Sequence, residues 1–258
     1  MFSLTTNNLS FAYKDLNTID HVNLQVKSGE VLVILGPNGI GKSTLINCLS
    51  GVFSKYQGSI KLDNEELKQI GSKELSHKLA LVSQRVNINT NLSLFDYLLL
   101  GRSAFHSIFS QPNKDDEKLV DQVISRIGLE NLKSTSLQNM SGGQKQLANI
   151  GRALVQEPKI LIMDEPTSAL DYKNQVNVLK LVKTFSNQGI AIVMSTHDPN
   201  QATMVADSVG LLVNNKTYRQ GSTEEILSDK SLSELYQTPI ISTFNEDLQR
   251  NVFGIEMG

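Results

Sequence analysis

The sequence predicts an α/β fold in which a mostly parallel sheet carries an antiparallel β subdomain and an inserted α-helical subdomain. Five short runs are solidly apolar, at residues 31–35, 79–82, 160–163, 190–194 and 209–213. Such continuous runs are typical of strands covered on both faces, and parallel sheets are covered on both faces by helices. The five runs therefore predict the parallel sheet.

Apolar and polar residues alternate in two other parts of the chain, from residue 2 to about residue 30 and across residues 58–63. Val22, Leu24 and Val26 show the alternation in the first part, and Ile60 and Leu62 show it in the second. A period of two is typical of a strand with one buried face. We expect these segments to form the antiparallel β subdomain.

Residues 86–150 contain no comparable apolar run. The sequences LSLFDYLLLG, DDEKLVDQVISRIG and GGQKQLANIGRALVQ carry helical spacing instead. We therefore predict a single domain over residues 1–258, with an α/β core of residues 1–85 and 151–258 and a helical subdomain of residues 86–150. The tail after residue 214 is too short for a regulatory domain, and STEE at residues 222–225 resembles the start of a helix.

The composition limits the possible partners. The chain has 258 residues, of which 40% are hydrophobic and 19% are charged, and its formal net charge is −2. This balance provides no basic surface for nucleic acid, so DNA and RNA binding are disfavoured. The single cysteine, Cys48, excludes an internal disulfide and suits a reducing compartment. The N-terminal segment lacks the pattern of a signal peptide, and no stretch approaches the roughly 20 apolar residues that cross a bilayer, which predicts a cytoplasmic protein.

Residues 36–44, GPNGIGKST, follow the first buried run and precede a helical pattern. Glycines let the backbone curl so that its N–H groups point at phosphate oxygens, and the helix adds its positive N-terminal end. Lys42 supplies a mobile charge for the outer phosphates, and the Ser43 hydroxyl is suited to Mg²⁺. The sequence therefore predicts a P-loop NTPase core that binds a nucleoside triphosphate, rather than a glycine-rich turn beside a chance Lys-Ser pair. The residues of the predicted phosphate loop are Gly36, Pro37, Asn38, Gly39, Ile40, Gly41, Lys42, Ser43 and Thr44.

Two carboxylates, Asp164 and Glu165, follow the buried run 160–163. Ligands bind at the carboxyl ends of the strands in open α/β sheets, so we expect these side chains beside the nucleotide. Asp164 would hold Mg²⁺, directly or through water, and Glu165 would act as the general base that polarises the attacking water. The alternative is an ordinary acidic loop after a strand, which the phosphate loop upstream makes the weaker interpretation.

A second candidate anion site lies at Ser141, Gly142, Gly143 and Gln144, immediately before a helical pattern. A serine followed by glycines at the start of a helix provides a hydroxyl, free N–H groups and the helix dipole. Alone, the same residues could be no more than a helix N-cap. The chain thus has two candidate devices for binding phosphate.

The ordered set GPNGIGKST, SGGQ, ILIMDEP, SALD and STHD resembles the ATP-binding cassette (ABC) ATPases, and the resemblance runs from residue 2 to about residue 240. It implies that two subunits pair head to tail, with ATP at the phosphate loop of one closed over by the SGGQ of the other. The resemblance thereby accounts for two anion sites in one chain, each as half of a composite pocket. One departure is Met140, where the family usually has leucine, and this nearly isosteric exchange puts little in doubt.

The resemblance implies roles for four further residues, each of which also has an ordinary structural interpretation. Tyr13 matches the aromatic that stacks on adenine, although aromatics are common in strands. Gln84 matches the glutamine that reaches Mg²⁺ and the attacking water, although alone it would be an ordinary residue at the end of a strand. Asp171 in SALD would help to align the paired subunits or act only as a helix N-cap. His197 in STHD matches the histidine that contacts the γ-phosphate.

Three segments resemble one branch of the family, the ATPases of metal-chelate importers for ferric siderophores, haem, cobalamin or molybdate-type oxyanions. They are LLLGR at 98–102, LDYKNQ at 170–175 and DPNQA at 198–202, although all three could simply fill helical surface. This branch implies a permease partner, an extracytoplasmic binding protein that acts indirectly, and a peripheral location on the inner face of the membrane. We expect the permease to dock on residues 84–110, where Leu92, Leu94, Phe95 and Leu98 exceed what a small helical core needs.

The main alternative is a soluble ABC ATPase without a permease, such as one that assists iron–sulfur cluster assembly, because it would share every nucleotide motif. A nucleotide-binding switch that does not hydrolyse ATP is disfavoured by the presence of both Glu165 and His197.

Overall fold

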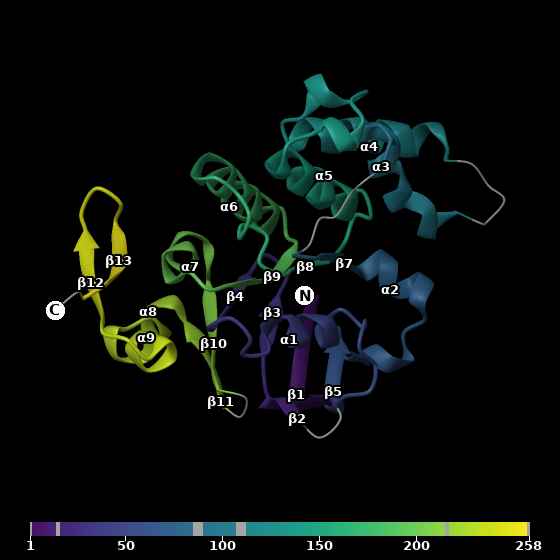
Figure 1. Cartoon of the computed structure of the whole chain (residues 1–258). Helices are drawn as coiled ribbons and strands as arrows, with labels where there is room; N and C mark the ends of the chain where they lie inside the picture. The colour runs from purple at the N-terminus through teal and green to yellow at the C-terminus, as the bar shows by residue number, and fades with distance from the viewer. Residues whose placement is uncertain (1, 14–15, 85–89, 107–111, 215–216, 257–258) are drawn as a thin grey trace.

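The computed structural model describes residues 2–13, 16–84, 90–106, 112–214 and 217–256, and Figure 1 shows the arrangement of their helices and strands. The principal sheet has the strand order β11-β10-β4-β9-β8-β7. Its members are β4 (Val31–Leu35), β7 (Leu79–Val82), β8 (Ile160–Met163), β9 (Ala191–Thr196), β10 (Ser208–Asn214) and β11 (Thr217–Ser222). Neighbouring strands are parallel except at the β10–β11 edge. The predicted α/β fold with a mostly parallel sheet is confirmed.

The two faces of this sheet pack against different layers. Val31, Val33 and Leu35 of β4 belong to one core cluster, which also contains the apolar residues of α6 (Tyr172–Asn187). Leu32 and Ile34 belong to the other cluster, together with the apolar face of α1 (Lys42–Leu49). All five residues of β4 are completely buried. Burial on both faces explains why the sequence of this strand is continuously apolar.

The predicted antiparallel strands form a separate sheet of order β2-β1-β5-β6, to which β3 adds through β1. Its strands are β1 (Ser3–Tyr13), β2 (Leu16–Val22), β3 (Gln25–Lys27), β5 (Gln57–Leu62) and β6 (Glu65–Glu66). Leu4, Leu9 and Ile60 share a core cluster with α1, so this sheet covers the helix that follows the phosphate loop. A 3₁₀ turn, η1 (Leu67–Gln69), and α2 (Ser72–Lys78) lead from it to β7.

All regular elements that the structure describes between residues 94 and 154 are helical. These are α3 (Leu94–Leu99), the 3₁₀ segment η2 (Leu100–Phe105), α4 (Lys114–Arg126), the 3₁₀ turns η3 (Glu130–Leu132) and η4 (Leu137–Asn139), and α5 (Gly142–Leu154). Helix α5 continues past the predicted boundary at residue 150, and the division of the chain into subdomains stays a prediction.

The helical core overturns part of the expected docking surface. Leu94 and Leu98 are completely buried in the core that α3 shares with α4 and α5, so they are not surplus apolar residues. Phe95 is partly buried against the same core, with Lys133 Nζ 4.6 Å from the centre of its ring. Leu92 is 37% exposed and Leu100 is 50% exposed. Residues 85–89 and 107–111 of this segment lie outside the described residues.

The end of the chain adds α7 (Pro199–Val205), α8 (Thr223–Ile226), α9 (Asp229–Tyr236) and a hairpin of β12 (Ile240–Asn245) and β13 (Arg250–Ile255). The predicted helix start at residues 222–225 is the N-cap of α8, where Ser222 and Glu225 form a capping box. The hairpin was not predicted. Figure 1 shows it at one side of the molecule, beyond α7 and α9. No helix in the described part of the chain is both long enough and apolar enough to span a bilayer.

Candidate active site

The phosphate loop connects β4 to α1 and requires glycine at Gly41, which caps the helix with a φ of 114°. A Cβ atom there would lie 2.7 Å from the Thr18 carbonyl oxygen, closer than packing allows. The loop borders a cavity of about 270 Å³. Its lining residues are Thr18, Asn38, Gly39, Gly41, Lys42, Ser43, Thr44, Gln84 and Glu165. The structure thus brings the predicted phosphate loop, Gln84 and Glu165 to one cavity.

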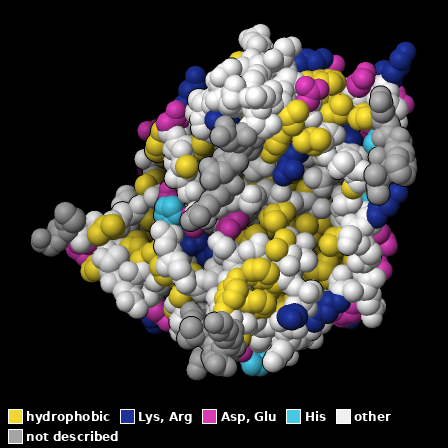
Figure 2. Space-filling view, turned by 45° about the vertical axis from the view of Figure 1, so that its right-hand side comes forward, with side chains coloured by type: hydrophobic (Ala, Val, Ile, Leu, Met, Phe, Trp, Pro, Cys, Tyr) yellow, Lys and Arg dark blue, Asp and Glu magenta, His cyan; other side chains and the backbone are white. Residues whose placement is uncertain are grey.

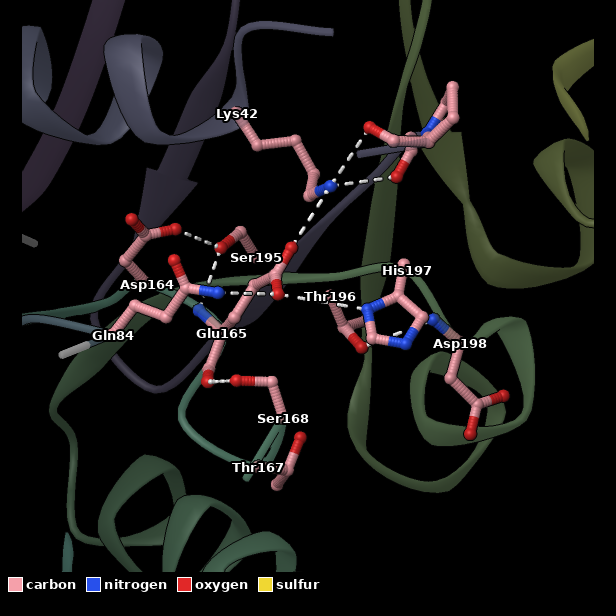
Figure 3. A network of polar contacts seen from close by, with 12 residues as sticks. Lys42, Gln84, Asp164, Glu165, Thr167, Ser168, Ser195, Thr196, His197 and Asp198 are labelled. Atoms are coloured by element: carbon pink, nitrogen blue, oxygen red, sulfur yellow. Dashed lines mark hydrogen bonds and ion pairs between the residues drawn. The ribbon is translucent and has the colours of Figure 1, made fainter. Parts of the chain in front are cut away.

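Lys42 is 4% exposed and its ammonium group has three oxygen partners. It donates to the carbonyl oxygens of Gly36 at 2.8 Å and Pro37 at 3.1 Å. It also forms an ion pair with Glu165, with 3.1 Å between Nζ and Oε1. Figure 3 shows these contacts. A phosphate oxygen in the cavity would compete for the same ammonium group.

Glu165 is the centre of the polar network in Figure 3. Its Oε2 accepts a hydrogen bond from Gln84 Nε2 at 3.0 Å and lies 3.7 Å from His197 Nδ1. Three of the residues predicted to be catalytic therefore meet at one carboxylate, although they come from the ends of β7, β8 and β9. This convergence follows from the topology, because adjacent parallel strands end at the same edge of the sheet.

Ser195, at the end of β9, is a structural member of the site that the sequence analysis missed. Its completely buried hydroxyl accepts from the Glu165 backbone N–H at 2.9 Å and donates to Asp164 Oδ1 at 2.7 Å. Glu165 itself has a positive φ of 44°, unusual for a residue with a side chain. The serine therefore holds the carboxylate of Asp164 and the main chain of the turn that carries Glu165. The available signal was its place directly before the Thr-His-Asp of STHD.

The residues near the phosphate loop fit Mg²⁺ through oxygen donors. Asp164 is buried and one of its oxygens is oriented by Ser195, while the hydroxyl of Ser43 and the amide of Gln84 belong to the lining of the cavity. Among the described residues, no group of three or more His, Cys, Asp or Glu could enclose a metal. A site with one carboxylate suits Mg²⁺, which typically keeps waters and substrate phosphates as its other ligands.

The serine–glycine turn at residues 141–144 contributes only Gly142 to a cavity that Glu165 also lines. Gly142 lines a separate cavity of about 130 Å³ whose lining includes Gln84 and Glu165. The Ser141 hydroxyl accepts from the Gln144 backbone N–H at 3.3 Å, and Gln144 Oε1 accepts from the Ser141 N–H at 2.9 Å. This is a capping box at the start of α5. Ser141, Gly143 and Gln144 are not among the residues that line the phosphate-loop cavity.

The other predicted site residues outside that lining are Gly36, Pro37, Ile40, Gly142, Asp164, His197, Asp171 and Tyr13. Asp171 caps α6 by accepting a hydrogen bond from the Asn174 N–H at 2.8 Å. Tyr13 is 49% exposed at the end of β1, with its ring edge-on to Phe11 and Phe53 at 5.0 and 5.7 Å between centroids. These rings form a half-exposed aromatic cluster, so contact of Tyr13 with adenine stays a prediction.

A phosphate loop between a buried strand and its helix, facing a carboxylate pair on a nearby strand of the same sheet, defines the class of P-loop NTPases. Within this class, the chain belongs to the ABC transporter family, whose sequence model matches residues 19–168. It is an ATPase of this family, and the predicted resemblance is confirmed.

Two relatives are named as import ATP-binding proteins. The petrobactin import ATP-binding protein FpuC of Bacillus anthracis is 32% identical over 234 residues, which cover 90% of this chain and 86% of FpuC. The molybdate import ATP-binding protein MolC of Haemophilus influenzae is 33% identical over 240 residues, covering 92% of this chain and 89% of MolC. A solved metal-chelate type ABC transporter in an inward-facing conformation shares 30% identity with a TM-score of 0.88, covering 99% of this chain and 98% of that one.

Proposed function

We propose that this chain is the ATP-hydrolysing subunit of an importer that takes up a metal chelate or a molybdate-type oxyanion through a partner permease. The observation that carries the hydrolytic role is the convergence of Lys42, Gln84 and His197 on Glu165. Two relatives are named as petrobactin and molybdate import proteins, and these names support the proposed class of cargo. In this role the chain lies on the cytoplasmic face of the membrane, held there by the permease, and an extracytoplasmic binding protein selects the cargo.

The buried pair of Lys42 and Glu165 indicates the first event of the reaction. When a triphosphate enters the cavity, its outer oxygens take over the Lys42 ammonium, which leaves Glu165 and the two loop carbonyls. Glu165 is then a carboxylate without its counter-ion, able to accept a proton from the attacking water. Gln84 orients this carboxylate through its amide, and His197 contacts the γ-phosphate.

Ser43 and Asp164 would hold Mg²⁺, with Gln84 near it. Mg²⁺, when bound, neutralises charge on the β- and γ-phosphates. Ser195 keeps Asp164 turned toward this position by donating to one of its oxygens. The chain itself therefore supplies the positioning, the general base and one carboxylate for the cation.

The substitution Glu165→Gln tests the hydrolytic role. It keeps the shape of the side chain and removes the base, so the turnover should fall by roughly 10²–10⁴ while the affinity for ATP is retained. Glu157→Gln is a matched control, because Glu157 also has a positive φ, of 50°, but lies outside the active-site cavities. Turnover of Glu165→Gln within a few-fold of the parent would remove Glu165 from the role of base.

The identity of the partner tests the transport role. Purification from detergent-solubilised membranes should recover the chain with a polytopic membrane protein. Recovery with a soluble scaffold complex instead would favour the alternative of a soluble ABC ATPase, such as one for iron–sulfur cluster assembly.

A further inference from the structure

The side chain of His197 depends on its main chain for its position. Its side chain is 49% exposed, and its ring nitrogen Nδ1 lies 3.7 Å from Glu165 Oε2. The backbone fixes the Cα–Cβ bond of a half-exposed side chain and thereby the few staggered positions that its ring can take. Whatever fixes the peptide of His197 therefore also fixes which positions the imidazole can reach.

The residues on either side of His197 are anchored locally. The Thr196 hydroxyl donates to Gln201 Oε1 at 3.1 Å. Asp198 caps α7 by accepting from the Asn200 N–H at 2.8 Å. These contacts lie within the turn between β9 and α7 and the first residues of that helix.

The carbonyl group of His197 has a partner from a distant part of the chain. The hydroxyl of Tyr236, the last residue of α9, donates a hydrogen bond to it at 2.8 Å. Burial raises the pKa of Tyr236, and the negative charges of Asp198 and Glu165 raise it further. The hydroxyl therefore stays protonated, and remains a donor, at any pH at which an ATPase works.

The terminal hairpin holds α9 and α7 in this relation. Asn200 of α7 makes two hydrogen bonds with the backbone of Phe253 in β13, one to its carbonyl at 3.0 Å and one from its N–H at 2.9 Å. At the other end, Ser233 of α9 accepts from the N–H of Ile240 in β12 at 2.9 Å. Hydrogen bonds thus link α7, the hairpin, α9 and the His197 turn into a ring. These elements border a cavity of about 440 Å³ that His197, Tyr236 and Phe253 help to line.

We propose that Tyr236 is a positioning residue for ATP hydrolysis. Its hydroxyl holds the carbonyl group of His197, and His197 in turn contacts the γ-phosphate. The terminal hairpin supports it by fixing α9 against α7. The unpredicted end of the chain thereby contributes to the catalytic step without touching the nucleotide. This inference rests on the proposed role of His197 in hydrolysis.

Tyr236→Phe tests the inference because it removes the hydroxyl and keeps the ring. One lost hydrogen bond to a positioned group should lower kcat for ATP about 3- to 10-fold. The KM for ATP, the affinity for ADP and the melting temperature should stay near those of the parent, because ADP has no γ-phosphate. Tyr56→Phe is the control, since the Tyr56 hydroxyl is also buried but makes no hydrogen bond with the described residues.

A double substitution shows whether Tyr236 acts through His197. In single-turnover measurements, Tyr236→Phe should reduce the rate no further in a His197→Ala background. A further loss there, or a parallel loss of ADP affinity and melting temperature in the single variant, would overturn the proposal. Parental kcat in Tyr236→Phe, with a strong loss in His197→Ala, would also overturn it and leave the proposed function intact. Parental kcat in His197→Ala would instead overturn the role of His197 on which the inference rests.

Discussion

The ion pair between Lys42 and Glu165 places the charge that binds phosphate against the group that activates water. Both side chains are nearly inaccessible, at 4% and 9% exposed. Two charges in such a place are stabilised chiefly by each other, and either one alone is costly. Before nucleotide binds, each charge therefore compensates the other, and on binding we expect the pair to be exchanged for contacts with phosphate.

At the scale of single residues, we expect Lys42→Met to lower the free energy of unfolding by about 3 kcal/mol without nucleotide, because it leaves Glu165 buried and unpaired. Adding Glu165→Gln should recover most of this loss, since the remaining amide is neutral. Urea unfolding of the parent, the two single variants and the double variant measures the coupling. Losses that simply add would show that the two groups do not stabilise each other.

At the scale of elements, packing explains Leu98, Gly101 and Arg102 of the segment LLLGR at residues 98–102, whereas Leu100 of the same segment is 50% exposed. Leu98 is completely buried between the helices, and a Cβ on Gly101 would lie 2.4 Å from the Arg152 carbonyl of α5. Arg102 donates to Asp116 Oδ1 and to the Val155 carbonyl, each at 2.8 Å. The segment therefore joins η2 to the start of α4 and the end of α5.

Asp116 is the buried acid of this junction, and it gives the helical part of the chain a dependence on pH. Burial opposes its ionisation, but hydrogen bonds from the Asn113 backbone, Arg102 and His106 outweigh burial and hold the pKa of Asp116 below its usual range. The folded protein thus binds the proton more weakly than the unfolded chain does. The ionised carboxylate stabilises the fold above pH about 4, and this contribution is lost as the pH falls through the lower pKa of the folded state.

We predict that Asp116→Asn destabilises the protein at pH 7 by about 2 kcal/mol, because Arg102 loses a charged hydrogen-bond partner. The difference from the parent should shrink as the pH is lowered below about 4. Chemical unfolding as a function of pH measures both effects. Asp115→Asn is the control, because Asp115 is 88% exposed on the same turn and should show neither. A difference that stays constant down to pH 2 would contradict the assignment.

The sequence predicted the elements that short contiguous patterns define, and it missed the contacts made between distant segments. The apolar runs and the glycine loop each carry their signal within a few residues, so the parallel sheet and the phosphate loop were predicted correctly. Ser195 and Tyr236 act through hydrogen bonds to groups that are far away in the chain, and the one local signal was the place of Ser195 in STHD. Leu94 and Leu98 were misassigned because a helical period shows that a face is buried without showing what covers it.

At the scale of the whole molecule, we propose that one chain provides only part of a nucleotide site. The capping-box turn of Ser141 does not contribute its hydroxyl to the phosphate-loop cavity. We infer that it serves the nucleotide of a second copy, paired head to tail. The capping box leaves a polar helix start available for that contact, because the hydroxyl oxygen accepts from the Gln144 N–H while its O–H can still donate to a phosphate oxygen.

We therefore expect Glu165→Gln to dimerise with ATP and Mg²⁺, and Ser141→Ala in that background to weaken the dimer about tenfold. Ser222→Ala is the matched control, because Ser222 closes the same kind of capping box on α8, away from any phosphate. Light scattering across a range of protein concentrations gives both dissociation constants. Equal weakening by the two variants would assign Ser141 to helix capping alone.

Coupling to the membrane requires an exposed surface beside the helical part of the chain. Figure 2 shows hydrophobic side chains gathered in a hollow on one face of the molecule. Among the described residues of 84–110, the large apolar side chains with high exposure are Leu92 and Leu100. Phe95, which also lies in this segment, packs partly on the core, so charging it would disturb folding as well as docking.

We predict that Leu100→Asp abolishes transport and leaves basal ATP hydrolysis near the parental rate, because Leu100 is 50% exposed and outside the active-site cavities. The aspartate would bury a charge at the contact with the permease. The free energy of burying this charge would be several-fold larger than the free energy that the apolar side chain of Leu100 contributes to the contact. Leu248→Asp, at a leucine that is 52% exposed in the terminal hairpin, is the control and should affect neither activity. Cargo uptake and ATPase rate, measured on the same reconstituted vesicles, separate the two effects. Equal loss of both activities in Leu100→Asp, with an unchanged control, would place Leu100 in the hydrolytic machinery and remove this surface from docking.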